Sequence, residues 1–223
     1  MEPSAAAAPV AVAFRAAAAG DTPWLAWVML AASRSHLARG LWEVALDLDE
    51  RGSLAWLERL AVTTARSWSH HAHFAVATVD RLPVAALCGY DPRESGGPVL
   101  FRAMAEVGQA LGWSAQRFAG VSERLGPIGT CAADPCAGAW VIENVATRPE
   151  LRRRGLCVEL LDRILERGRC RGHRRALVSV LIGNTAAERA YEKVGFRVVG
   201  EKRHASFEAA FGSPGQRHLL REL

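Results

Sequence analysis

The sequence predicts an α/β fold in which helices cover a mixed β-sheet. Three observations predict this class. Apolar residues recur at helical spacing in several segments, short apolar runs typical of strands lie between them, and glycine or proline marks many of the boundaries. With 223 residues, half of them apolar, the chain is long enough to bury a substantial core. We expect one domain over residues 10–223, preceded by a flexible leader at residues 1–9.

The first expected elements are an edge strand and a long helix. Residues 10–15 alternate apolar and other side chains, which indicates the strand. Asp21 and Pro23 mark the start of the helix, because a capping residue is followed by a proline near the first turn. An apolar stripe at helical spacing follows from Trp24, and Gly40 is the expected end of this helix.

A second helix and a β-hairpin come next. Ser53 is the expected cap of the helix, whose leucines recur every three residues along one face. Residues 73–79 and 82–88 read as two strands. Asp80 and Arg81 lie between them, and a two-residue connection of this kind predicts a tight hairpin turn.

Residues 91–137 are too many for a simple connection between strands. Proline and glycine break the chain at the start of this segment, and an amphipathic helix is then predicted by apolar residues at spacings of four, three and four: Leu100, Met104, Val107 and Leu111. Residues 114–124 predict another helical piece. The segment therefore reads as a helical insertion.

The rest of the chain predicts strands that alternate with helices. The expected elements are a buried strand at 139–147, a helix from about Val158 that closes at Gly168 or Gly172, an apolar strand at 176–182, a helix capped by Asn184 and ended by Gly195, and final strands at 196–200 and 218–221. The apolar strand at 176–182 is of the kind that favours a central position in a sheet.

The most informative segment is the turn between the strand at 139–147 and the helix that follows it. Its sequence is Arg152-Arg153-Arg154-Gly155-Leu156-Cys157. Gly155 allows the backbone to approach an anion where the helix begins, and the first N–H groups of a helix are free to bind phosphate. The arginines add fixed positive charge that can bind phosphate through paired hydrogen bonds. This turn predicts a phosphorylated ligand.

Composition disfavours several other classes of function. The net charge is +5, but the arginine-rich region lacks the interleaved aromatic side chains that stack on bases, so we expect no nucleic acid. No apolar run is long enough to cross a membrane. The five cysteines are odd in number and lack CxxC spacing, and the cluster His70, His71 and His73 has no carboxylate or cysteine at ligand spacing. We therefore expect no disulfide framework, no metal and a cytoplasmic location.

Two motifs together resemble the GNAT superfamily of acyl-CoA-dependent N-acyltransferases. The phosphate turn of that family matches Arg152, Gly155 and Cys157, although cysteine departs from the usual glycine or alanine at the last place. The second motif of the family matches a longer set: Asn184, Tyr191, Glu192, Lys193, Gly195 and Phe196. The resemblance covers residues 139–203, and the insertion at 91–137 departs from the family pattern.

The resemblance implies a mixed, mostly antiparallel central sheet with helices on both faces. A splayed pair of parallel strands would end near Thr147 and Ile182, and acetyl-CoA would lie in the gap between them. The backbone of Val145, Ala146 and Thr147 would bind the pantetheine arm. The N–H groups of residues 153–157 would hold the pyrophosphate. The other residues that the resemblance assigns to the cofactor are Arg152, Asn184 and Lys193.

Two residues are candidates for the chemistry. Glu143 is charged within an apolar strand, which requires a reason, and we interpret it as the general base that deprotonates an amine. The alternative is a carboxylate paired with an arginine. The resemblance favours Tyr191 as the acid that protonates the departing thiolate, and the alternative is a packing tyrosine. Asn184 is first a helix cap and a candidate contact to pantetheine.

The leading interpretation is an N-acetyltransferase that moves an acetyl group from acetyl-CoA to a primary amine. The acceptor surface would come from the helices in residues 23–66, the insertion at 91–137 and the segment after Gly200. A small-molecule amine is slightly favoured over a peptide amine, and a homodimer is possible. The alternatives are a non-catalytic acyl-CoA-binding regulatory module and an arginine-rich nucleic-acid binder, whose affinity would depend steeply on salt.

Overall fold

A seven-stranded sheet forms the centre of the residues that this computed structural model describes, which are 12–134, 136 and 138–223. The spatial order is β1-β2-β3-β4-β5-β7-β6, and every neighbouring pair is antiparallel except the parallel pair β4 and β5. The predicted mixed, mostly antiparallel sheet is confirmed. The strands are β1 (Val12–Ala16), β2 (Phe74–Val79), β3 (Leu82–Tyr90), β4 (Ala139–Thr147), β5 (Arg175–Leu181), β6 (Arg197–Arg203) and β7 (Gly215–Glu222).

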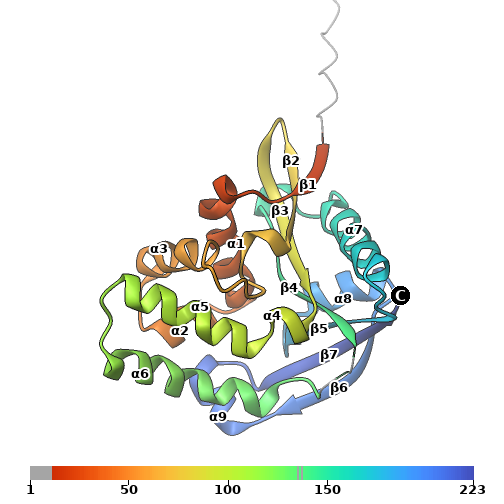
Figure 1. The fold of residues 1–223 in the computed structure, drawn as a ribbon. Helices are drawn as coiled ribbons and strands as arrows, with labels where there is room; N and C mark the ends of the chain where they lie inside the picture. The colour runs from red at the N-terminus through yellow and green to blue at the C-terminus, as the bar shows by residue number, and fades with distance from the viewer. Residues whose placement is uncertain (1–11, 135, 137) are drawn as a thin grey trace, which may run out of the picture.

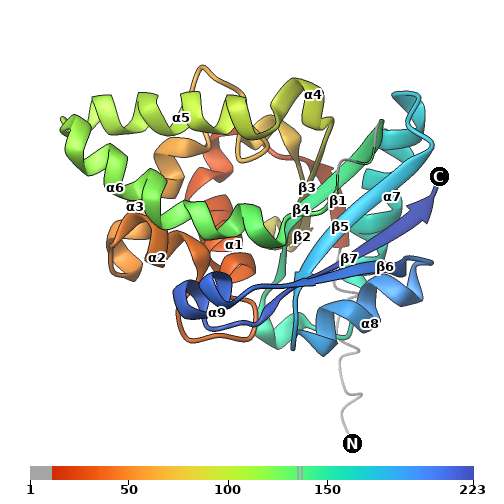
Figure 2. The same ribbon diagram turned by 90° about the horizontal axis from the view of Figure 1, so that it is seen from below.

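Helices cover both faces of the sheet (Figures 1 and 2). The α-helices of the described residues are α1 (Thr22–Arg34), α2 (Leu41–Leu46), α3 (Glu50–Leu60), α4 (Pro92–Ser95), α5 (Gly97–Ala110), α6 (Ala115–Leu125), α7 (Leu156–Cys170), α8 (Thr185–Lys193) and α9 (Ala205–Phe211). Short 3-10 helices are η1 (Ala19–Asp21), η2 (His71–His73), η3 (Gly126–Cys131) and η4 (Pro149–Leu151). Helices α1 to α6 lie on one side of the sheet, and α7 and α8 lie on the other. None of the helices in the described ranges is both long and apolar enough to span a lipid bilayer.

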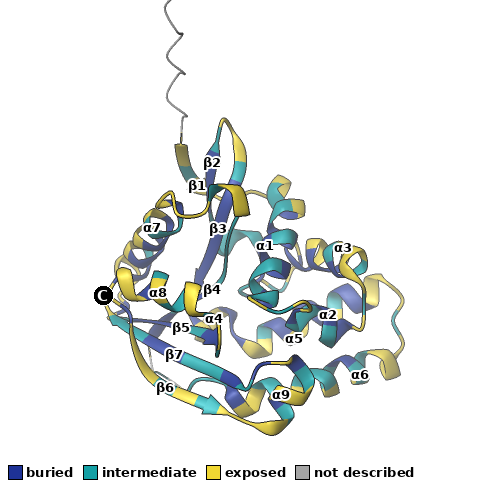
Figure 3. Ribbon diagram, turned by 180° about the vertical axis from the view of Figure 1, so that it is seen from behind, coloured by how far each residue is buried: buried dark blue, intermediate teal, exposed yellow. Residues whose placement is uncertain are grey.

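Two hydrophobic cores follow from this layering. One lies between the sheet and α1, α3, α5 and α6, and the other lies between the sheet and α7 and α8. Strand β3 is buried along nearly its whole length, whereas the edge strand β6 is mostly exposed (Figure 3). Burial on both faces is what the sequence predicts for a central strand with a continuous apolar run.

Trp140 in β4 fixes the position of α7 against the sheet. Its side chain is 1% exposed. A Cβ atom at Gly168 of α7 would lie 2.8 Å from the Trp140 Cγ, and one at Gly89 of β3 would lie 2.5 Å from the Trp140 Nε1. Both positions are therefore restricted to glycine, because a protein core packs at nearly crystalline density. Gly168 lies inside α7 rather than at its end, and Gly172, at φ +83°, follows the helix.

Strands β4 and β5 separate along their length, as the resemblance implies. Their pairing runs from Ala139 with Arg175 to Ile142 with Val178. Strand β4 carries a bulge opposite β3, where the register shifts, and Asn144 adopts the left-handed conformation at φ +54°. A bulge bends a strand and increases its twist. The second half of β4 therefore turns away from β5 and leaves a V-shaped gap.

The first long helix ends earlier than the sequence predicts. Helix α1 stops at Arg34, because Ser35 turns the chain at φ +58°. Gly40 was expected to end this helix, but it precedes α2 as its N-terminal cap. A Cβ atom there would lie 2.7 Å from the backbone nitrogen of Arg34, so glycine is required for close packing rather than for a helix exit.

The expected cap at Ser53 is also wrong. Asp49 caps α3 instead, and its Oδ1 accepts a hydrogen bond of 2.8 Å from the backbone of Gly52. Ser53 lies within the helix and is buried. Asp49 and Ser53 are both residue types that cap helices. The aspartate caps this helix, and its negative charge is favoured at a helix N-terminus by the helix dipole.

The later elements largely follow the sequence. The hairpin turns at Asp80 and Arg81, both at positive φ, and helices lie at both positions expected within the insertion. Helix α8 begins after Asn184 and is followed by Gly195 at φ +86°. The final strands are longer than expected, and α9 between them was not predicted. The expected first strand begins at Val12, and the proposed leader at 1–9 lies outside the described residues.

Candidate active site

Glu143 is the first residue of β4 beyond its pairing with β5. The last pair is Ile142 with Val178, and both side chains belong to the core under α7. Because successive side chains of a strand point to opposite faces, Glu143 faces the side of α1 to α6. Its carbonyl accepts a hydrogen bond of 3.3 Å from the Cys88 thiol on β3. The carboxylate therefore projects from the base of the V-shaped gap.

Burial controls the protonation of Glu143. Desolvation raises the pKa of its carboxyl from an ordinary value near 4.5 to about 7. No arginine contributes to this shift, and among the described residues Glu143 has no ion-pair partner. An arginine would lower the pKa instead, so the paired-carboxylate alternative has no support from the geometry. A carboxyl with a pKa near neutrality can both accept and release a proton at physiological pH.

Tyr191 approaches the same gap from the opposite side of the sheet. Its side chain is 5% exposed, belongs to the core with α7, and meets the Phe196 ring edge-on at 5.8 Å between centroids. Burial raises the pKa of the phenol well above its ordinary value, and the neighbouring acidic groups of Cys157, Glu143 and Cys88 raise it further. The phenol is therefore protonated at neutral pH and available as a proton donor.

Cys157 at the start of α7 does not suit nucleophilic chemistry. Burial raises the pKa of its thiol to about 11. A cysteine nucleophile acts as its thiolate, which is scarce at neutral pH with such a pKa. All five cysteines, each within the described residues, are free thiols.

The phosphate turn has the geometry that an anion site requires. Gly155 adopts φ +80° and caps α7, a helix of 15 residues, and Arg153 is also left-handed at φ +62°. Arg152, Arg153, Arg154 and Gly155 are exposed, whereas Leu156 is buried and anchors the helix start. Within the described residues the guanidinium groups of Arg153 and Arg154 form no ion pair. The start of α7 therefore offers free N–H groups and unpaired positive charge.

The end of β4 lies next to this turn. Val145, Ala146 and Thr147 are half-buried, and their strand borders the gap on the side away from β3. Arg152 ties the turn to the strand, because its Nε donates a hydrogen bond of 3.3 Å to the Thr147 carbonyl. The structure thus joins the residues expected to contact pantetheine with those expected to hold pyrophosphate.

The two remaining expected ligands, Asn184 and Lys193, lie at opposite ends of α8. Asn184 caps α8, since its Oδ1 accepts from Ala187 at 3.2 Å, and its Nδ2 donates to the Ser35 hydroxyl at 2.6 Å. Both ends of this amide are thus engaged within the protein. Lys193 is exposed at the far end of α8, about 13 Å along the helix from its start.

Two polar residues near the gap were missed. Ser179 lies in the apolar strand β5, and its hydroxyl is 2.9 Å from the His218 Nδ1 on β7. The signal that identified Glu143, a polar residue in an apolar strand, was also present at Ser179. The histidines considered as a metal cluster serve structural roles instead: His70 caps η2, and the His73 ring bonds to Ser95. In the described part of the chain, no His, Cys, Asp and Glu side chains are grouped so as to hold a metal ion.

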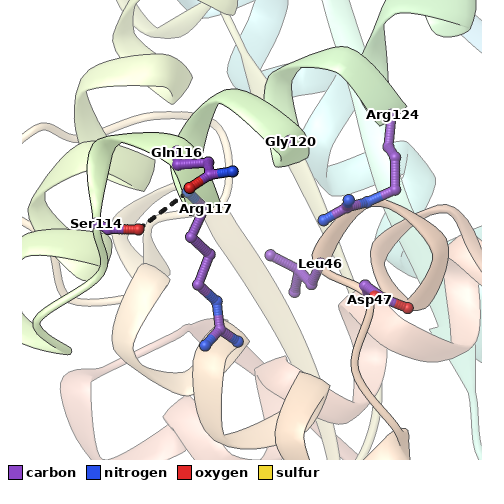
Figure 4. Close-up of a pocket in the computed structure, with 7 residues that line it drawn as sticks. All are labelled: Leu46, Asp47, Ser114, Gln116, Arg117, Gly120 and Arg124. Atoms are coloured by element: carbon purple, nitrogen blue, oxygen red, sulfur yellow. Dashed lines mark hydrogen bonds between the residues drawn. The ribbon is translucent and has the colours of Figure 1, made fainter.

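Two surface concavities lie outside this constellation. One, of about 350 Å³, lies between α2 and α6 and is lined by polar side chains that include Asp47, Arg117 and Arg124 (Figure 4). The other, of about 530 Å³, borders the segment after β4 and includes Trp24 and Arg148. Neither is lined by Glu143 or Tyr191, so neither contains the candidate catalytic groups.

Comparisons with known proteins agree with the geometry. The model of the Acetyltransferase (GNAT) family matches residues 46–196. No curated protein matches the chain significantly. A solved acetyltransferase structure has a TM-score of 0.69 at 16% identity, covering 94% of this chain and 98% of that one.

Two further solved structures share the fold. A Drosophila melanogaster polyamine N-acetyltransferase, which catalyses the formation of N-acetylagmatine, has a TM-score of 0.59 at 18% identity, with 96% of this chain and 100% of that one covered. An acetyltransferase from Salmonella typhimurium, solved with its cofactor acetyl-CoA, has a TM-score of 0.53 at 16% identity, with 96% and 94% covered. At these identities the similarity establishes the fold. The family match over most of the chain establishes more: this protein belongs to the GNAT acetyltransferase family and is an acyltransferase that uses acetyl-CoA.

Proposed function

We propose that the protein transfers the acetyl group of acetyl-CoA directly to a primary amine, with Glu143 as the base and Tyr191 as the acid. The observation that carries the proposal is the carboxyl of Glu143, raised to a pKa of about 7 at the base of the splayed strands. A base of this strength is half deprotonated at neutral pH. It is therefore matched to removing a proton from an alkylammonium ion, whose ordinary pKa is about 10.4.

Glu143, Tyr191 and solvent water complete the proton balance of the proposed reaction. Glu143 removes one proton from the ammonium group, and the nitrogen lone pair forms the bond to the acetyl carbonyl carbon. The carbon–sulfur bond then breaks, and the coenzyme A sulfur leaves as a thiolate. Tyr191 donates its phenol proton to that thiolate. The nitrogen releases its second proton to solvent water as the amide forms.

We place the acetyl-CoA along the V-shaped gap. The free N–H groups at the start of α7 would bind the pyrophosphate, together with the arginines of the turn. The pantetheine arm would follow Val145 to Thr147. Asn184 already caps α8 and bonds to Ser35, so its contribution would be to hold α8 against α1. Lys193 is exposed at the end of α8, and its contact with the cofactor stays a prediction.

The acceptor would bind on the side of the sheet that carries α1 to α6. Glu143 faces this side, and residues 91–137 add α5 and α6, which pack against α3 and α2. We regard this segment as an insertion within a single catalytic domain, because its helices enclose the acceptor side. Such a cover favours a small-molecule amine over a peptide. The acetylation of agmatine by the Drosophila neighbour makes agmatine and polyamines the first amines to test.

Thiol release from acetyl-CoA with a panel of amines tests the proposed function. The panel should contain agmatine, polyamines, arylalkylamines and lysine peptides, with hydroxyl acceptors as controls. We expect thiol release with at least one primary amine and an acetamide product by mass spectrometry. Binding of acetyl-CoA without turnover of any amine would instead favour the non-catalytic acyl-CoA-binding module.

Substituting Tyr191→Phe tests the acid. Phenylalanine keeps the ring that packs against Phe196, so the fold should persist. We expect kcat to fall about 10²-fold, since a positioned proton donor contributes roughly this much or more. The KM for acetyl-CoA should change little. An unchanged kcat, measured by thiol release with the best amine of the panel, would show that the tyrosine only packs.

A further inference from the structure

The polar pair Ser179 and His218 lies beside the candidate active site. Ser179 on β5 and His218 on β7 are directly opposite in the antiparallel ladder, and the Ser179 Oγ is 2.9 Å from the His218 Nδ1. His218 is 4% exposed, and its Nε2 is buried without a close hydrogen-bond partner among the described residues. A buried imidazole with an unpaired nitrogen has a desolvation cost that a purely structural position would avoid.

The strand register places this pair across the gap from Glu143. Ile142 and Val178 are the last paired residues of β4 and β5, and both face α7. The next residue of each strand, Glu143 and Ser179, therefore faces the opposite side, where α1 to α6 lie. At this level the strands have begun to diverge beyond the spacing of about 4.8 Å between paired strands. Glu143 and Ser179 thus flank the base of the gap on the acceptor side.

The hydrogen bond to His218 leaves the Ser179 oxygen able to accept a further hydrogen bond. Burial lowers the pKa of the imidazole, and the charge of Lys202 lowers it further, whereas the Cys131 backbone and Asp134 raise it by less. The ring is therefore neutral at pH 7 and has one N–H. A hydroxyl oxygen has two lone pairs, so Ser179 keeps at least one free whether its hydroxyl donates to Nδ1 or accepts from it.

The Ser179 side chain is half-buried, whereas that of His218 is buried. The strand register places two acceptors at the base of the gap, the Glu143 carboxylate on β4 and the Ser179 Oγ on β5. A primary amine can donate to both and still direct its lone pair at the acetyl carbonyl. A secondary amine has one N–H fewer and leaves one buried acceptor unpaired.

We propose that Ser179 binds the acceptor amine through its Oγ, that His218 positions it, and that this pair selects primary over secondary amines. The proposal rests on the proposed function, because it requires an amine acceptor at Glu143. It adds a determinant of acceptor specificity that the base and acid do not supply. Leaving a buried polar group unpaired is the penalty that discriminates most strongly between such substrates.

The test compares wild type with Ser179→Ala on a primary amine and its N-methyl derivative. We expect Ser179→Ala to lower kcat/KM for the primary amine about 10-fold, as the loss of one hydrogen bond does. The kcat/KM for the N-methyl amine should be nearly unchanged. The ratio of kcat/KM between the primary and the N-methyl amine should therefore fall about 10-fold. The KM for acetyl-CoA should not change. Ser179→Thr keeps the hydroxyl and should retain most of the preference.

The positioning role of His218 is tested by comparing His218→Asn with His218→Ala. His218→Asn keeps an acceptor near the position of Nδ1 and should retain more of the preference than His218→Ala. If the His218 variants fold poorly, as melting temperatures would show, the Ser179 series decides the outcome alone. If wild type is active and Ser179→Ala has the same ratio of kcat/KM between the primary and the N-methyl amine, this inference is overturned. The proposed function then remains intact. Failure of every amine to release thiol overturns the proposed function, and the inference with it.

Discussion

Glu143→Gln is expected to lower kcat by about 10²- to 10⁴-fold at pH 7, the range that a positioned general base contributes. Glutamine has nearly the same shape but cannot accept a proton. The wild-type rate should rise with pH through about 7, because the base acts in its deprotonated form and its pKa is about 7. In Glu143→Gln, the rise of the rate with pH around 7 should be absent. Steady-state kinetics from pH 5.5 to 9 with the best amine would measure both effects.

Two controls separate this loss from damage to the donor site. Calorimetry should show that Glu143→Gln binds acetyl-CoA as tightly as wild type, because the carboxylate lies on the acceptor side of the gap. Glu143→Asp keeps the carboxylate on a shorter side chain and should recover part of the rate. An undiminished kcat in Glu143→Gln, or an unchanged pH profile, would remove Glu143 from the mechanism.

Gly155→Ala is expected to raise the KM for acetyl-CoA about 10²-fold, which is the cost of a misplacement of about 1 Å at a reacting ligand. A methyl group at this position would stand at the mouth of α7, where the pyrophosphate is proposed to lie. The start of the helix is otherwise open, since no protein atom lies within 4 Å of such a Cβ. Direct binding of acetyl-CoA, measured by calorimetry at two salt concentrations, would test the effect independently of turnover.

Gly172 at the other end of α7 provides a matched control. It has φ +83°, against +80° for Gly155, and a Cβ atom there would also meet nothing within 4 Å. Gly172→Ala therefore carries the same left-handed strain, about 1 kcal/mol of stability, without a ligand nearby. Equal losses of acetyl-CoA affinity in the two variants would mean that the effect arises from strain in α7, and the phosphate site would have to be sought elsewhere.

The sequence predicted the elements whose signals are local. The cap at Asn184, the glycine exit at Gly195 and the apolar strand that became β5 depend on neighbouring residues and were found in place. The charged residue inside an apolar strand correctly marked Glu143 as unusual, but its pKa depends on burial that only the assembled layers create. Local patterns thus marked the candidate site without describing its electrostatics.

The features that were missed depend on contacts between distant segments or on unusual backbone. Ser35 ends α1 in a left-handed conformation that serine rarely adopts, so no propensity predicted it. Ser179 and His218 are 39 residues apart, and only the adjacency of β5 and β7 joins them.

Glu143 and Tyr191 lie on opposite faces of one sheet, and this arrangement affects how protons would be transferred in the proposed reaction. The proposed base thus faces α1 to α6, the proposed acid packs on the side of α7, and the opening between the diverging strands lies between them. The negative charge of Glu143 helps to keep the phenol of Tyr191 protonated across the sheet. In the proposed mechanism each turnover leaves Glu143 protonated and Tyr191 deprotonated, so both must return to their starting states before the next turnover.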